Sequence, residues 1–148
     1  MLSAQSLFFM KGEEQTMLKK TIKYHDYNGS ERTGDFYFNF SKAELAEMEL
    51  SVKGGFAQML QSIIDANDVP SLAKVFKDLI LKSYGVKSAD GVEFEKSEEI
   101  SRHFMQTDAY SVLYMELIQD AKAAADFCNA LIPKDLADEI AKKNNASN

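Results

Sequence analysis

Cysteine is nearly absent from this 148-residue chain, which contains only Cys128 and can therefore form no intramolecular disulfide. A single domain of this length buries about two thirds of its unfolded surface, so its core needs neither a disulfide nor a metal ion. Because Cys128 lies in an apolar helical stretch, we expect it to be a small core residue. A catalytic thiol would need a basic partner, and neither His25 nor His103 is near Cys128 in the sequence.

Arginine is also scarce, with only Arg32 and Arg102, and the chain carries a net charge of −6. Nonspecific binding to nucleic acid requires many lysines and arginines that neutralise phosphates. Apolar runs are short, and none approaches the ~20 residues of a membrane span. The apolar stretch 6–10 is too short for a signal peptide and follows no basic segment. We therefore expect a cytoplasmic protein that binds neither nucleic acid nor membrane.

The motifs of the common enzyme classes are missing as well. There is no Walker loop, no Rossmann glycine pattern, no Gly-x-Ser-x-Gly elbow and no Cys or His pair at zinc-ligand spacing. Residues 88–93 contain Asp-Gly but lack the alternating carboxylates of a calcium loop, which favours a turn. A group of four glutamates could suggest a metal or a basic partner, but a solvated face is favoured. These are Glu93, Glu95, Glu98 and Glu99. We expect no catalysis, no cofactor and no metal site.

Residues 1–16 fit nothing that follows and are expected to be a translated leader or a disordered N-terminus. The codons for residues 11–14 are nearly all purine, as in a ribosome-binding site just upstream of a start codon. Met17 is therefore a candidate for the natural initiator, with Met1 as the alternative.

Residues 17–40 alternate as a β-hairpin does. Leu18, Ile22 and Tyr24 share one face of the first strand, and Phe36, Phe38 and Phe40 share one face of the second. Asn28-Gly29 supplies a turn, while Gly34 indicates a longer loop or a bulge. Because an isolated hairpin is marginal in water, the phenylalanine face should pack on helices or on another copy of the chain.

The rest of the chain reads as five to six short helices. They are expected over residues 41–50, 56–66, 70–84, 97–105, 107–118 and 120–133. Ser41 and Glu44 have the capping-box spacing, and Gly85 is expected to be the C-cap of the third helix. The fold class is therefore mainly α with an N-terminal β-hairpin (α+β), in a single domain over 17–133. Residues 134–148 are expected to be weakly helical and then disordered.

The remaining features of the sequence suit a protein that binds other proteins. The chain has seven methionines, a residue that adapts its shape and suits protein-binding surfaces. Core packing explains the candidate contact residues equally well, so both interpretations stay open. The candidates are Phe36, Phe38, Phe40, Phe104, Met105, Tyr110, Leu113 and Tyr114.

Several segments resemble the tail assembly chaperones of long-tailed (siphovirus-type) bacteriophages. They are residues 17–22, 35–40, 77–85, 88–91, 94–97, 107–113 and 123–133. The resemblance implies a small, acidic, mainly helical protein that assists tail assembly without joining the virion. It implies that the chain coats the tape-measure protein, keeps it soluble, recruits major tail protein and self-associates. The alternative is another phage morphogenesis or structural (neck/tail) protein that is retained in the virion.

The resemblance also implies two product lengths, because many such chaperones are extended by a −1 ribosomal frameshift. Ala141-Lys142-Lys143 could be encoded as GCA-AAA-AAG, which contains the slippery heptamer A-AAA-AAG. The alternative is that two lysines are simply common in a polar tail.

Overall fold

The computed structural model describes residues 17–132. In chain order the elements are β1 (Leu18–His25), β2 (Glu31–Phe38), α2 (Lys42–Ser51), α3 (Phe56–Asp65), α4 (Val69–Ser83), β3 (Tyr84–Lys87), β4 (Phe94–Glu95), α5 (Glu98–Met105), α6 (Asp108–Gln119) and α7 (Ala121–Leu131). This confirms a hairpin followed by six helices over 17–132. The predicted leader 1–16, the predicted tail 134–148 and the codons for Lys142 and Lys143 lie outside the described residues.

The four strands form one antiparallel sheet in the order β1-β2-β3-β4. The predicted hairpin is confirmed, with a register running from Leu18 opposite Phe38 to His25 opposite Glu31. The prediction of Gly85 as a helix C-cap is wrong, because α4 ends at Ser83 and Gly85 lies in β3, opposite Tyr37. A Cβ atom at Gly85 would lie 2.8 Å from the backbone oxygen of Glu95, so close strand packing explains the glycine.

The hairpin turn is the longer loop that the sequence allowed. Gly29 has φ +86°, and the Asp26 carboxylate accepts hydrogen bonds at 2.9 Å from the backbone N–H groups of Asn28 and Ser30. Gly34 pairs with Ile22 in the uninterrupted register of β1 and β2, so the prediction of a bulge at Gly34 is wrong. A Cβ at Gly34 would meet the Phe36 ring at 3.1 Å, which explains the small residue there.

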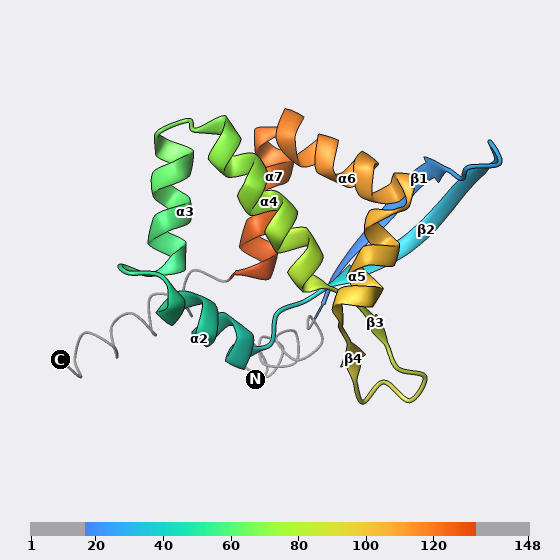
Figure 1. Cartoon of the computed structure of the whole chain (residues 1–148), viewed down its shortest axis with the longest axis horizontal. Helices are drawn as coiled ribbons and strands as arrows, with labels where there is room; N and C mark the ends of the chain where they lie inside the picture. The colour runs from blue at the N-terminus through green and yellow to red at the C-terminus, as the bar shows by residue number, and fades with distance from the viewer. Residues whose placement is uncertain (1–16, 133–148) are drawn as a thin grey trace, which may run out of the picture.

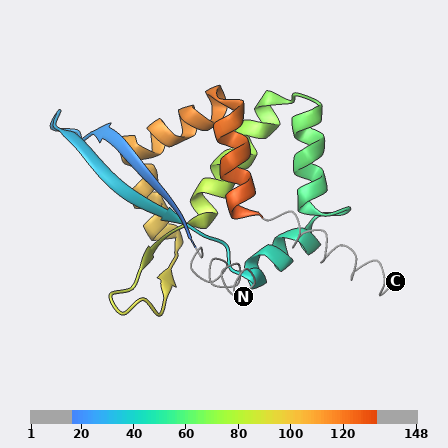
Figure 2. The same cartoon turned by 180° about the vertical axis from the view of Figure 1, so that it is seen from behind.

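Helices of the same chain cover the inner face of the hairpin, as Figures 1 and 2 show for α5, α6 and α7. Phe38 is fully buried, with its ring centroid 5.9 Å from that of Phe104 and 5.6 Å from that of Phe127. Helix α6 runs along β1, where the Lys20 ammonium lies 3.4 Å from the Glu116 carboxylate. The phenylalanine face was predicted to pack on helices or on another copy of the chain, and in the structure it packs on helices.

Local capping explains where the helices begin. The capping box at Ser41 and Glu44 is present. Ser97, Thr107 and Asp120, where three of the predicted helices start, each accept a backbone N–H of their helix. Helix α3 has no side-chain cap of its own. Instead, the buried Glu49 of α2 accepts a hydrogen bond at 3.0 Å from the N–H of Ala57. This carboxylate links α2 to the first turn of α3.

Candidate functional site

An open groove of about 640 Å³ is lined by α2, the C-terminal end of α4 and α5. Helix α2 forms one wall and α5 the other, with the last turn of α4 between them. Its lining residues are Phe40, Glu44, Glu47, Met48, Leu81, Lys82, Lys96, Ser97, Glu98, Ser101, Arg102 and Met105.

The floor of the groove is apolar. Phe40 is buried and Leu81 is half-buried, so both present only part of their surface. Met48 on α2 and Met105 on α5 face the same space from opposite walls, and Met105 is 37% exposed. A groove with adaptable methionines on both walls suits the apolar stripe of an added helix.

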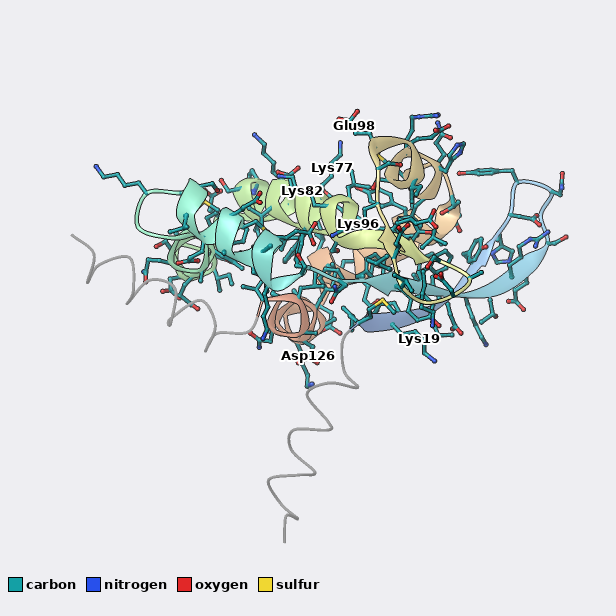
Figure 3. The ribbon with its side chains drawn as sticks, turned by 90° about the horizontal axis from the view of Figure 1, so that it is seen from below. Lys19, Lys77, Lys82, Lys96, Glu98 and Asp126 are labelled. Atoms are coloured by element: carbon teal, nitrogen blue, oxygen red, sulfur yellow. The ribbon has the colours of Figure 1, made fainter. Side chains whose placement is uncertain are left out.

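Lys96 lines the groove and hydrogen-bonds to three segments of the chain (Figure 3). Its ammonium donates hydrogen bonds to the Glu44 carboxylate at 2.8 Å, to the Asn39 carbonyl at 2.9 Å and to the Lys82 carbonyl at 3.2 Å. These bonds use all three donors of the ammonium. Because the Lys82 carbonyl is at the C-terminal end of α4, the cation also meets the negative end of the helix dipole. Lys96 thus ties α2 to α4 beside the groove.

The acid–base state of Glu44 follows from this arrangement. Burial by itself would raise the pKa of the Glu44 carboxyl, but hydrogen bonds from Lys96 and from the Ser41 backbone outweigh it. The pKa of Glu44 is therefore lowered, and the carboxylate stays ionised at neutral pH as partner of Lys96. Its side chain remains 40% exposed, so solvent screens the pair.

The predicted contact residues fall into two groups, those that are buried and those that keep some exposed surface. Phe36, Phe38, Phe104 and Tyr110 join Tyr84 in an aromatic cluster under the hairpin, where the Tyr84 and Phe104 rings stack at 4.3 Å. The buried members of the predicted set pack in the core, which is one of the two interpretations that the sequence left open. They are Phe38, Phe40, Phe104 and Leu113, all between 0% and 7% exposed.

The other predicted residues keep some surface. Phe36, Tyr110 and Tyr114 are half-buried at the edge of the aromatic cluster, and Met105 is exposed. Of the whole predicted set, only Phe40 and Met105 line the groove. No sequence pattern assigned Lys96 to a site, because its hydrogen-bond partners Asn39, Glu44 and Lys82 are 14 to 57 residues away in the chain.

The other candidate reactive groups named from the sequence form no second site among the residues that the structure describes. Cys128 is buried as predicted, and burial raises the pKa of its thiol to about 11, so the thiol is unreactive at neutral pH. The four glutamates of the acidic group are all exposed, which supports the solvated face, and Glu99 lies 3.7 to 3.8 Å from His103 and Arg102. Within residues 17–132, no three His, Cys, Asp or Glu side chains are placed to hold a metal ion. No helix in that range is long and apolar enough to cross a bilayer.

The structure is a small α+β domain with an open groove that has an apolar floor. A profile of the phage tail assembly chaperone family matches residues 17–148. The chain therefore belongs to the phage tail assembly chaperones, which confirms the resemblance seen in the sequence. No curated protein and no solved structure matches the chain.

Proposed function

We propose that this chaperone binds an amphipathic helix of the phage tape-measure protein in the groove between α2, α4 and α5. A long helical tape measure exposes apolar stripes until tail protein surrounds it, and exposed stripes aggregate. The observation that carries the proposal is the apolar floor with Met48 and Met105 on opposite walls. Covering a stripe there would keep the tape measure soluble without any catalytic step.

The wider role rests on the family. Bound chaperone would recruit major tail protein to the tape measure in the bacterial cytoplasm and then leave, so it would be missing from the virion. We also propose a frameshift-extended form made at the codons for Lys142 and Lys143. An intact A-AAA-AAG heptamer and an overlapping downstream frame would support this form, whereas an alanine codon GCC or GCG without such a frame would contradict it.

Co-expression with the tape-measure protein tests the groove directly. Met105→Asp places a charge on the groove wall, and we expect it to reduce the soluble tape measure captured with the chaperone about tenfold. Met115→Asp is the matched control, because Met115 lies outside the groove on α6 and is similarly exposed at 45%. Equal capture by both variants would place the binding site elsewhere.

The second candidate function is that of a structural (neck/tail) protein, which would be retained in the virion. Membership of the chaperone family favours the first candidate. Mass spectrometry of purified virions separates the two, because a chaperone should be absent from mature particles and a neck or tail component should be stoichiometric.

Self-association also stays a prediction. Sedimentation velocity of the purified chain across a concentration series measures the oligomeric state, and a strictly monomeric chain would contradict this part of the proposal.

A further inference from the structure

The outer half of the β1–β2 hairpin projects beyond the helices that cover its base (Figures 1 and 2). Glu31, Arg32, Thr33 and Asp35 of β2 are all exposed, whereas Phe38 at the base of the strand is fully buried. These four exposed residues therefore contribute little to the core of the domain.

One edge of β2 lacks a neighbouring strand over this outer half. Strand β2 pairs with β3 only at Tyr37 and Phe38, and from Val86 onward β3 pairs with β4 instead. Just past the end of β2, the N–H of Asn39 donates a hydrogen bond to the Ser83 carbonyl at 2.8 Å, which shows which backbone groups point to the β3 side.

The backbone groups along the outer half of this edge can be assigned from that bond. Because N–H directions alternate along a strand, those of Glu31, Thr33 and Asp35 point to the same side as that of Asn39, away from β1. Among the residues that the structure describes, no strand lies opposite these three. Such an edge is a template for β-strand addition, in which main-chain hydrogen bonds supply the affinity.

The tip of the hairpin holds this edge in an ordered form. The Asp26 carboxylate accepts hydrogen bonds at 2.9 Å from the N–H groups of Asn28 and Ser30, and at 2.6 Å from Nε of Arg32. A strand added to an edge that is already ordered loses less conformational entropy on binding. The same contact pairs the charge of Arg32 with that of Asp26.

The side chains on the outer face of the edge are acidic. Alternation places Glu31, Thr33 and Asp35 on the face turned away from the core, and within residues 17–132 neither carboxylate takes part in an ion pair. A second copy added antiparallel around Thr33 would set Glu31 of one chain opposite Asp35 of the other, and like charges directly opposite are destabilising. The edge is therefore complementary to a basic strand rather than to itself.

We propose that the β2 edge from Glu31 to Asp35 accepts an extended strand of a partner protein that carries lysine or arginine at the spacing of these two carboxylates. The inference rests on the proposed function, in which the protein recruited to the tape measure is the major tail protein. None of the residues of this edge lines the groove, so both partners could be bound at once.

Proline substitution tests the backbone pairing in co-expression with the major tail protein. Thr33→Pro removes the N–H at the centre of the open edge, and we expect it to reduce the major tail protein captured about tenfold. Lys23→Pro is the matched control, because Lys23 lies directly opposite Thr33 and its N–H points to the other edge of the hairpin. Capture should be unchanged by this control.

Charge reversal tests the chemistry of the partner strand and leaves the backbone intact. We expect Glu31→Lys combined with Asp35→Lys to weaken capture about fivefold in low salt, with a smaller loss as sodium chloride is raised. Glu93→Lys combined with Glu95→Lys is the control, since it makes the same change of net charge at exposed residues of the β3–β4 hairpin. Thermal unfolding of every variant shows whether a loss comes from unfolding.

The outcomes separate this inference from the proposed function. If the original chain captures the tape-measure protein but no major tail protein, the proposed recruitment is wrong, and the inference fails with it. If the original chain captures major tail protein and Thr33→Pro captures as much as Lys23→Pro, recruitment stands and the edge is overturned as its site. If the reversal at Glu31 and Asp35 behaves like the reversal at Glu93 and Glu95, the basic character of the partner strand is overturned.

Discussion

The aromatic cluster under the hairpin and the groove between α2, α4 and α5 are built from similar apolar side chains but end in opposite states. In the cluster, α5, α6 and α7 close over β2, and Phe38 and Phe104 are 0% and 3% exposed. In the groove, α2 and α5 border an open space, and Met105 keeps 37% of its surface in contact with solvent. A large apolar side chain thus stabilises the fold where its own chain covers it, and is available for docking where the chain leaves it open.

Truncation in the cluster should have the largest effect. Phe38→Ala removes a fully buried ring between Phe104, Phe127 and Tyr84, and should lower the free energy of unfolding by about 3–5 kcal/mol. Urea denaturation followed by circular dichroism measures the loss. A loss below ~1 kcal/mol would mean that the cluster is not the main support of the hairpin.

Removing the Lys96 ammonium, which ties α2 to α4 beside the groove, should lower the free energy of unfolding by less. Lys96→Met keeps the length of the side chain but leaves the Asn39 and Lys82 carbonyls without their donor and Glu44 without its cation. We expect a loss of about 1–3 kcal/mol in the free energy of unfolding, measured by the same denaturation. Lys122→Met, which removes an exposed ion pair with Asp126, is the matched control and should change stability by under ~0.5 kcal/mol.

The ion pair between Lys96 and Glu44 predicts a small pH dependence of the free energy of unfolding. Because the folded pKa of Glu44 is lowered, its pairing stabilises the fold above the ordinary value of 4.5 and is lost as the pH falls through the lowered pKa. The effect should stay under about 1 kcal/mol, since the side chain is 40% exposed. Unfolding measured between pH 7 and pH 3 should be less pH-dependent in Glu44→Gln than in the original chain. An unchanged pH dependence would contradict the lowered pKa.

A groove variant should have the smallest effect on stability. Met105→Asp replaces a side chain that already contacts solvent, and we expect the free energy of unfolding to change by about 0.5 kcal/mol or less. Thermal unfolding checks this value, and a loss comparable to that of Phe38→Ala would erase the distinction between the two regions.

The sequence was sufficient wherever short-range physics decides the structure. The caps at Ser41, Ser97, Thr107 and Asp120 set helix starts, and alternation placed Phe36 and Phe38 on one face. Strand β3 was missed because residues 79–84 continue a helical pattern locally. Its strand conformation comes from pairing with Tyr37 and Phe38, nearly fifty residues earlier.

The candidate site was less predictable. Phe40 and Met105 were selected as candidate contacts, but no local pattern shows that they meet at one groove. Lys96 follows a short strand and has no recognisable motif, since its role depends on carbonyls of Asn39 and Lys82 brought together by the fold. The sequence also could not decide whether the phenylalanine face is covered by its own helices or by another copy, because either solution buries the same side chains.

Photo-crosslinking tests the central claim most directly. A photoreactive p-benzoylphenylalanine is introduced at Met105 in the groove, and separately at Met115 on α6, in chaperone co-expressed with the tape-measure protein. The account predicts a crosslink to the tape-measure protein from position 105 and none from position 115. A crosslink from position 115 alone would show that the tape measure binds outside the groove.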